Sequence, residues 1–438
     1  MTTAFKVIVV GAGPAGLSLA HALSLAKIDF VVLERRETVS MDSGASLVLA
    51  PTTLRVMEQF GLLDKLLALG GELKSNKTLD VRGNELGHSE AVQLMRKNHG
   101  TAPIAFHRAH LIDAIHDGLS AEAKSKIITG KRISDIISDD NGAVVHCEDG
   151  TSYEGDIVIG ADGVHSQVRR IMRKMAVAGG READWDPEVP YTSEYRCLWC
   201  SFPHPDSGLG YDTQDRDRSV MYLGGVERSW IFLYERLPQK TRERASYSDR
   251  DVDDMAARFA EYPVTEKLKV KDCYAMKITA GMSNLEEGIL KHWSYGRIAL
   301  VGDACHKFTP NAGLGFNNGM QDLVALCNGI YKGVQASPND SKLDMPTVHS
   351  IFASYQAARK SEIQAQFAQS THTTRMQAWS SPPHYLMARI MGKDFVQKIL
   401  LNYVASRAIS KSLILEYGPN PTVVQGAVPW VHQITPAV

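Results

Sequence analysis

The residues best suited to chemistry lie in segment 296–322, where Asp303 follows an apolar run at 298–301. A carboxylate at the end of a strand can accept hydrogen bonds from the hydroxyl groups of a polyol. Gly313 and Gly315 follow, and their lack of a side chain lets a flat ring approach the backbone closely. Backbone N–H groups at a helix start there could hold an electron-rich oxygen atom. The segment therefore predicts a ligand site at a turn between a strand and a helix.

A second glycine-rich segment, GAGPAG at 11–16, follows a strand-like run at 5–10 and precedes a helical pattern. In this context the G-x-G-x-x-G spacing is typical of a dinucleotide site. Gly11 permits the tight turn, Gly13 admits the pyrophosphate, and Gly16 lets helix and strand pack closely.

The acid expected in such a site is Glu34, which ends a second apolar strand at 30–33. A carboxylate at this position can hydrogen-bond a ribose diol. It favours a cofactor with a free 2′-hydroxyl, such as FAD or NAD. We interpret the neighbouring Arg35 and Arg36 as solvated side chains that change this inference little.

A third motif is Asp162-Gly163, in the segment DIVIGADGVHSQVRR at 156–170. A run of β-branched residues ends just before it, so we expect another strand followed by a turn and a helix. Taken alone, this is an ordinary strand-to-helix turn. Taken in order, the chain has a dinucleotide motif, an Asp-Gly motif and a Gly-Asp motif.

This order resembles that of the single-component FAD-dependent aromatic hydroxylases and epoxidases, in which three such segments surround one extended FAD. The resemblance implies that Asp162 and Gly163 lie by the pyrophosphate and that Asp303 binds the ribityl chain. Arg108 matches an arginine at a helix start beside the flavin, although an ordinary ion pair would also explain it. The cofactor-binding residues implied are Gly11, Gly13, Ala15, Gly16, Glu34, Arg35, Gly44, Ala45, Arg108, Asp162, Gly163, Asp303, Pro310, Gly313, Gly315, Phe316 and Asn317.

A narrower resemblance extends over nearly the whole chain. Segments such as GASLVLAPTTLRVMEQFGL (44–62), EYRCLW (194–199) and HKFTPNAGLGFNNGMQD (306–322) are similar to those of the paxilline-type FAD-dependent monooxygenases of fungal secondary metabolism. The resemblance implies that NADPH or NADH reduces the flavin as a transient co-substrate. Reaction with O2 would then give a C4a-hydroperoxide that epoxidises or hydroxylates a hydrophobic prenylated indole, indole diterpene or meroterpenoid.

Other functions stay open from the sequence. A salicylate-hydroxylase-like enzyme acting on a small phenol would share all three FAD motifs. A non-enzymatic escort protein with a related fold is the other alternative, but it gives no reason for the Asp-Gly and Gly-Asp pair. Arg196 is our candidate for a catalytic residue that donates a hydrogen bond or a proton to substrate. The alternative is an ion pair with Glu194, two residues away on the same face of a strand.

The predicted fold class is α/β: a Rossmann-like FAD-binding domain of the aromatic-hydroxylase type, with an inserted antiparallel β-sheet and a helical C-terminus. We assign residues 1–180 and 282–370 to the FAD-binding domain, 181–281 to the substrate-binding insert, and 371–438 to the helical segment. Strands are expected within the insert at 196–202, 219–223 and 230–234. The polar stretches 207–217 and 238–250 are expected to be loops.

Charge and cysteine content exclude several classes of partner. The 438 residues carry 48 Lys and Arg against 49 Asp and Glu, so no net field attracts nucleic acid. The six cysteines are scattered, and the C-x-x-C at 197–200 lies in an expected strand that points the two thiols to opposite faces. We therefore expect reduced thiols and no metal site.

The expected location is cytoplasmic, because no signal peptide precedes the first strand and no apolar run is long enough to span a bilayer. Segment 395–415 has apolar residues with Lys398, Arg407 and Lys411 between them. It is expected to pack on the domain with a solvated basic face. The alternative is an interfacial helix that attaches the protein peripherally to an internal membrane. The sequence does not indicate an oligomeric state.

Overall fold

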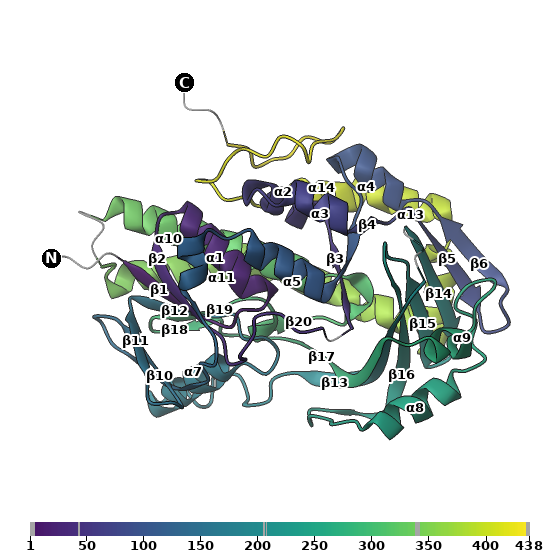
Figure 1. The fold of residues 1–438 in the computed structure, drawn as a ribbon, viewed down its shortest axis with the longest axis horizontal. Coiled ribbons are helices and arrows are strands. Elements are labelled where there is room, and N and C mark those ends of the chain that lie inside the picture. The colour runs from purple at the N-terminus through teal and green to yellow at the C-terminus, as the bar shows by residue number, and fades with distance from the viewer. Residues whose placement is uncertain (1–4, 43, 205, 207, 338–341, 435–438) are drawn as a thin grey trace.

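The computed structural model describes residues 5–42, 44–204, 206, 208–337 and 342–434. A six-stranded sheet has the order β18-β19-β12-β1-β2-β8 and is parallel except at β18 (Figure 1). Its strands are β1 (Lys6–Val10), β2 (Asp29–Leu33), β8 (Ile127–Ile128), β12 (Ile157–Gly160), β18 (Ser294–Tyr295) and β19 (Ile298–Leu300). The strands that precede the three motifs, β1, β12 and β19, are therefore neighbours in one sheet.

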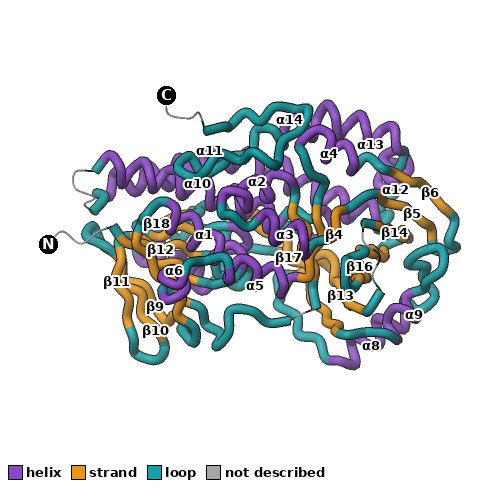
Figure 2. The backbone as a smooth tube through the Cα atoms, turned by 45° about the horizontal axis from the view of Figure 1, so that its top comes forward, coloured by secondary structure: helices purple, strands orange, loops and turns teal. Residues whose placement is uncertain are grey.

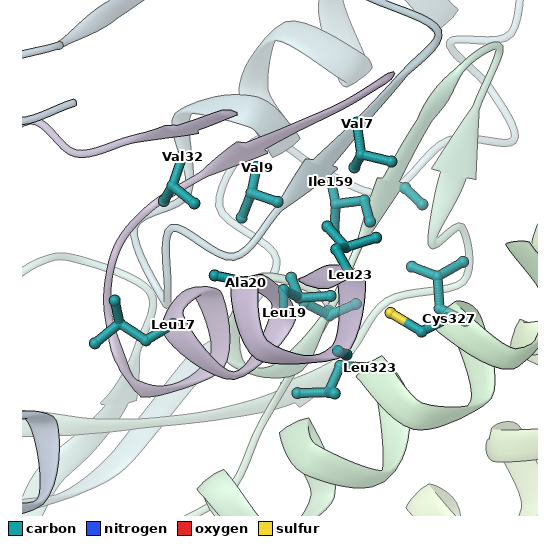
Figure 3. Close-up of a cluster of buried hydrophobic side chains, with 14 of the residues drawn as sticks. Val7, Val9, Leu17, Leu19, Ala20, Leu23, Val32, Ile159, Leu323 and Cys327 are labelled. Carbon is teal, nitrogen blue, oxygen red and sulfur yellow. The ribbon is translucent and has the colours of Figure 1, made fainter. Parts of the chain in front are cut away.

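This sheet is covered on both faces, which explains why its central strands are continuous apolar runs. Figure 1 shows α1 (Pro14–Leu25), α10 (Gly315–Ala336) and α11 (Met345–Gln377) on one side. On the other side lie α7 (Gln167–Ala178) and a small sheet of β9 (Ile133–Ser138), β10 (Ala143–Cys147) and β11 (Ser152–Gly155). The fully buried side chains of Val7, Val9, Leu19, Leu23 and Leu323 meet in the core between β1, α1 and α10 (Figure 3).

A second, eight-stranded sheet has the order β20-β17-β13-β16-β15-β14-β5-β6 and is antiparallel except between β14 and β5. Its strands are β5 (Ser75–Asp80), β6 (Glu85–Ser89), β13 (Thr192–Phe202), β14 (Leu209–Asp215), β15 (Arg218–Leu223), β16 (Ser229–Thr241), β17 (Thr279–Ile289) and β20 (His306–Lys307). Two of these strands come from residues 75–89, outside the stretch 181–281 that we expected to build the sheet. The domain boundaries themselves stay a prediction.

Alternating side chains give this sheet two different faces. Leu198 and Cys200 pack against Val252 and Met255 of α8 (Asp249–Arg258), and α9 (Val270–Ala275) adds to the same cluster. The neighbouring positions of β13 point to the opposite face, where they pack with Val48, Ala105 and Ala378 at the end of α11 (Met345–Gln377). The face away from α8 therefore borders the interior of the molecule.

The remaining elements connect and cover the two sheets. A three-stranded sheet contains β3 (Ser46–Leu49), β7 (Ile104–His107) and β4 (Gly71–Glu72). The remaining helices are α2 (Pro51–Gln59), α3 (Leu63–Leu69), α4 (Val92–His99), α5 (Arg108–Asp117), α6 (Ala121–Ser125), the short turns η1 (Gly302–Ala304) and η2 (Pro310–Ala312), α12 (Pro382–Met391), α13 (Asp394–Leu400), the π-helical turn η4 (Leu401–Ala405) and α14 (Ser406–Ile409). No helix in the described ranges is both long enough and apolar enough to cross a bilayer.

One loop prediction was wrong and another was right in part. Segment 207–217 contains the strand β14, whereas residues 242–248 of segment 238–250 form the expected loop between the end of β16 and the start of α8. After α14, residues 410–434 form neither helix nor strand and run as a loop across α2 and α4 (Figures 1 and 2). This loop is fixed by tertiary contacts, such as the Ala427 N–H donating to the Lys97 carbonyl at 2.9 Å and Gln59 Nε2 donating to the Leu415 carbonyl at 2.9 Å.

Candidate functional site

A cavity of about 1290 Å³ begins at the carboxyl ends of β1, β12 and β19 and continues to the inner face of the eight-stranded sheet. Ligands of open α/β sheets bind outside the carboxyl ends of the strands. Here those ends contribute Gly11, Asp162 and Asp303 to the cavity wall. The cavity thus brings together three motifs that are far apart in the sequence.

In the glycine loop between β1 and α1, two glycines are required by the fold itself and the third is not. Gly11 has a φ of +102°, and a Cβ on Gly16 would lie 1.8 Å from the Gly11 carbonyl oxygen. Gly13 has an ordinary φ of −72°, and a Cβ there would meet no protein atom within 4 Å. Because neither backbone geometry nor packing requires a glycine at Gly13, its bare backbone fits the close approach of a ligand.

Glu34 stands beside this loop at the end of β2. Its carboxylate oxygens accept hydrogen bonds from the Ala12 N–H at 2.8 Å and the Arg36 N–H at 3.0 Å. The side chain is buried and lines the cavity together with Arg35 and Arg36. Glu34 therefore has a fixed orientation and can still accept hydrogen bonds from a bound diol.

The Asp-Gly motif begins the turn into α7. Asp162 Oδ2 accepts hydrogen bonds from the N–H groups of Gln167 (2.7 Å) and Val168 (3.1 Å) at the start of that helix. Its Oδ1 is buried and has no partner among the described residues. Burial raises the pKa of Asp162, and hydrogen bonds from Ser166 and the helix backbone oppose that rise. The unpaired oxygen marks a place where a ligand could supply a donor.

Opposite charges meet around Asp303. Its Oδ2 accepts a 2.6 Å hydrogen bond from the Lys307 ammonium group. Burial lowers the pKa of Arg108, the nearby charge of Arg36 lowers it further, and Asp303 opposes both effects. All four side chains line the cavity. The basic residues on its wall are Arg35, Arg36, Arg108, Lys131, Arg132, Arg170, Arg244 and Lys307, which suits an anionic ligand such as a pyrophosphate.

The structure separates the predicted cofactor residues into two groups. Those that line the cavity are Gly11, Gly13, Ala15, Glu34, Arg35, Ala45, Arg108, Asp162, Gly163, Asp303, Pro310, Gly313, Gly315 and Phe316, and we call this part of the wall the cradle. Gly16, Gly44 and Asn317 lie behind the wall. Asn317 Nδ2 donates to the carbonyls of Val48 (2.9 Å) and Gly313 (2.7 Å), so it connects β3 to the loop at the start of α10.

Arg196 does not lie where its predicted catalytic role requires. It is absent from the cavity wall and lies on the α8 face of the sheet, where its Nε donates to Glu235 at 3.0 Å. The register of β13 and β16 places these two residues directly opposite each other. Arg258 and Arg218 share the same carboxylate. The ion-pair alternative thus describes Arg196 better, with Glu235 rather than Glu194 as partner.

Sequence reasoning missed the side chains at the far end of the cavity. Trp199, Met221, Leu223 and Phe232 form an apolar wall on the inner face of the eight-stranded sheet. Strand alternation indicated these positions only in general terms. One carboxylate, Asp212, also belongs to this wall, and its strand had been predicted as a loop.

A buried polar cluster supports the Gly302-Asp303 turn from behind. Asp322 of α10 accepts hydrogen bonds from the Gly302 N–H (3.0 Å), His306 Nε2 (2.5 Å) and Arg359 Nε (3.0 Å). Cys305 lies close enough that a cysteine, a histidine and an aspartate could share a metal ion. Because the Arg359 guanidinium already pairs with Asp322, a cation at this point would be repelled, and we interpret the cluster as structural.

Comparison with known proteins agrees with this geometry. The family model described as "FAD binding domain" matches residues 4–347. The FAD-dependent monooxygenase DEP2 of Alternaria brassicicola is 31% identical over 409 residues, which cover 90% of this chain and 76% of DEP2. The FAD-dependent monooxygenase SAT1 of Stachybotrys chartarum is 44% identical over 224 residues, covering 50% of this chain and 74% of SAT1.

Among solved structures, a single-residue variant of HpxO from Klebsiella pneumoniae, complexed with FAD, matches with a TM-score of 0.74 at 21% identity. The match covers 92% of this chain and 99% of that HpxO chain. At this identity the likeness concerns the fold. It confirms the predicted α/β class with an inserted antiparallel sheet and helices near the C-terminus.

Proposed function

The chain belongs to the FAD binding domain family, and from this membership we propose the reaction that its cavity carries out. The chain is an FAD-dependent monooxygenase. We propose that it belongs to the paxilline-type group and oxygenates a hydrophobic natural-product intermediate, such as a prenylated indole, an indole diterpene or a meroterpenoid. NADPH or NADH is the proposed reductant, as is typical of the family.

We assign the groups of FAD to parts of the wall as follows. Glu34 would accept hydrogen bonds from the ribose, the Gly13 and Asp162 region would hold the pyrophosphate, and Asp303 would bind the ribityl chain. When bound, FAD supplies the redox chemistry by which NAD(P)H and O2 give one oxygen atom to substrate and one to water. The protein's part is to bind, to orient and to exclude water from the reacting groups.

The observation that carries the proposal is the continuity of the cradle and the apolar wall in one cavity. Its volume, about 1290 Å³, exceeds the roughly 300–1,000 Å³ typical of a site for one drug-sized ligand. A second molecule can therefore lie against Trp199, Met221 and Phe232 while the cradle is filled. The size and apolar character of this wall favour a polycyclic or prenylated substrate over a small phenol.

The proposal predicts a yellow protein that contains one FAD per chain and consumes NAD(P)H and O2 faster when a suitable substrate is added. The test is incubation with NADPH or NADH and a panel of prenylated indoles, meroterpenoids and simple phenols. Flavin bleaching and product mass are measured, and an increase of one oxygen atom is expected. Turnover of phenols alone would favour the aromatic-hydroxylase alternative, and a colourless protein that takes up no FAD would overturn the assignment.

We also propose that helices α12 to α14 contact an anionic membrane surface. Phe395 and Tyr403 are each 65% exposed, and Leu386 is 61% exposed, which is unusual for large apolar side chains that lie near one another in sequence. Between residues 381 and 415 the basic residues are Arg389, Lys393, Lys398, Arg407 and Lys411, whereas the acidic residue is Asp394. Exposed apolar side chains interspersed in sequence with basic ones are typical of interfacial helices.

This surface borders the cavity, because Gln397 of α13 belongs to the cavity wall. We expect the protein to sediment with vesicles of phosphatidylcholine and phosphatidylserine, and to do so less in high salt. The double variant Phe395→Ser, Tyr403→Ser should bind at least about tenfold more weakly, because burial of one such side chain stabilises binding by about 1.5–3 kcal/mol. Val189→Ser, at another exposed apolar residue, is the control. Equal sedimentation of both variants would contradict the proposal.

A further inference from the structure

The carboxylate of Asp212 stands on the part of the cavity wall that also carries Trp199, Met221 and Phe232. Asp212 lies on β14 directly opposite Met221 of β15, and both side chains line the cavity with Trp199 and Phe232. The hydrogen-bond partners of Asp212 among the described residues, Asn76 and Gln377, do not belong to the cradle. An acid among apolar side chains needs a reason, because an unpaired charge there is costly to bury.

The hydrogen bonds of Asp212 come from neutral amides. Asn76 Nδ2 donates to Oδ2 at 2.8 Å, and Gln377 Nε2 donates to Oδ1 at 2.9 Å. Within the described part of the chain, no lysine, arginine or histidine forms a salt bridge with it. Burial raises the pKa of Asp212 to about 6, and the two amide hydrogen bonds only partly oppose that rise. Each oxygen keeps room for a further donor, and the open side is the cavity.

The charged side chains on elements packed against β14 have partners of their own. Examples are Lys77 of β5 with Glu266, Asp80 of β5 with the Asn84 amide, Arg218 of β15 with Glu235, Asp215 of β14 with the Tyr262 hydroxyl, and Arg375 of α11 with Glu194 and Glu287. One ionisable group that interacts electrostatically with Asp212 is the buried phenol of Tyr234, whose own pKa is raised well above its usual value by burial. Asp212 is therefore available to a ligand.

Asp212 is also connected to the loop that precedes α10. Gln377 Oε1 accepts a hydrogen bond from Asn311 Nδ2 at 2.7 Å, and Asn311 lines the cavity beside Pro310 and Gly313. The resemblance assigns this loop to the flavin side of the cofactor. A molecule that reaches Asp212 would thus lie against the apolar wall. Asp212 itself is joined to the loop by two consecutive hydrogen bonds through Gln377.

We propose that Asp212 is the specificity-determining residue of the cavity and that it orients substrates by accepting a hydrogen bond from an O–H or N–H donor. The substrate class is then an apolar, ring-containing skeleton with one such donor. This inference rests on the proposed function, because it assigns substrate to this end of the cavity. An analogue without the donor would leave the carboxylate desolvated and unpaired, and a site built for a donor discriminates strongly against such analogues.

The test compares two probes that differ in a single donor, carbazole and N-methylcarbazole. Each is titrated into the FAD-loaded enzyme, and the dissociation constant is obtained from the change in visible flavin absorbance. At pH 8 we expect the wild-type protein to bind carbazole at least about tenfold more tightly. Asp212→Asn should reduce this preference to less than about threefold, because the neutral amide is a weaker acceptor. Asp215→Asn, on the same strand but the opposite face, should keep the preference.

A second measurement needs no variant. Because the pKa of Asp212 is raised to about 6, the carboxylate is ionised at pH 8 and mostly protonated at pH 5. The preference of the wild-type protein for carbazole should therefore fall at pH 5, whereas that of Asp212→Asn should not change with pH. Equal binding of the two probes by the wild-type protein, binding of neither, or an unchanged preference in Asp212→Asn would each overturn the inference. Failure of the proposed function would appear differently, as the absence of oxygenated product from every substrate.

Discussion

Replacement of Gly13 by valine should give a folded protein that no longer retains FAD. A Cβ at this position would meet no protein atom within 4 Å, and the φ of −72° suits any residue. The new side chain would instead project into the cavity at the start of α1, where we assign the pyrophosphate. Loss of the hydrogen bonds made at close approach should weaken FAD binding by about 100-fold. Flavin absorbance after desalting reports the loss, and circular dichroism reports the fold.

Two other glycines serve as controls for this experiment. Gly61 has a φ of +73° and open space around it, so Gly61→Ala should lower stability through backbone strain and leave FAD bound. Gly16→Ala should impair folding itself, because its Cβ would lie 1.8 Å from the Gly11 carbonyl oxygen. If Gly13→Val held FAD as tightly as the wild-type protein, the pyrophosphate would have to lie elsewhere.

The convergence of the three motifs could be predicted from sequence because each follows a short apolar strand. Parallel strands with covered faces place their carboxyl ends at one edge, so Gly11, Asp162 and Asp303 had to meet if their strands were neighbours. The structure makes them neighbours, in the order β19-β12-β1. The spacing of the motifs could not show which of their residues line the cavity and which lie behind its wall. It did not separate Gly313, which lines the cavity, from Gly44 and Asn317, which lie behind the wall.

The substrate end of the cavity was less predictable for a physical reason. β14 reads as a polar loop because Asp212 and Gln214 interrupt its apolar alternation. Those polar groups accept hydrogen bonds from Asn76, Gln377 and Trp379, all distant in sequence, so only the folded chain gives them partners. Apolar–polar alternation therefore does not identify a strand whose polar side chains form hydrogen bonds at the wall of a cavity. The catalytic role predicted for Arg196 has a different weakness. The alternation of side chains along a strand shows that a sheet has two faces, but it does not show which face borders the cavity.

Removal of the carboxylate at Asp322 should destabilise the protein strongly and loosen the turn that carries Asp303. Asp322 and His306 are fully buried, and Arg359 is 1% exposed. Truncating one partner of a buried charged cluster leaves the other charge uncompensated and costs about 3–5 kcal/mol. Asp322→Asn should therefore lower the free energy of unfolding in urea by at least about 3 kcal/mol. Arg359 keeps its contact with Glu362, so the effect should lie at the lower end of that range. Retained FAD should also decrease, because Asp322 accepts the Gly302 N–H.

The stability difference between the wild-type protein and Asp322→Asn should depend on pH in a defined direction. Burial alone would raise the pKa of Asp322, but His306 and Arg359 outweigh it, so the pKa lies below its usual value. A carboxyl with a depressed pKa stabilises the fold above its unfolded pKa, about 3.9, and loses that contribution as the pH falls through its folded pKa. The wild-type protein and Asp322→Asn should thus differ most in stability near neutral pH and converge in acid. Asp117→Asn, which removes one partner of the exposed pair with Lys65, should change little at any pH. A difference between wild type and Asp322→Asn that stayed constant into acid would show that packing, rather than the buried charge, holds the Gly302-Asp303 turn.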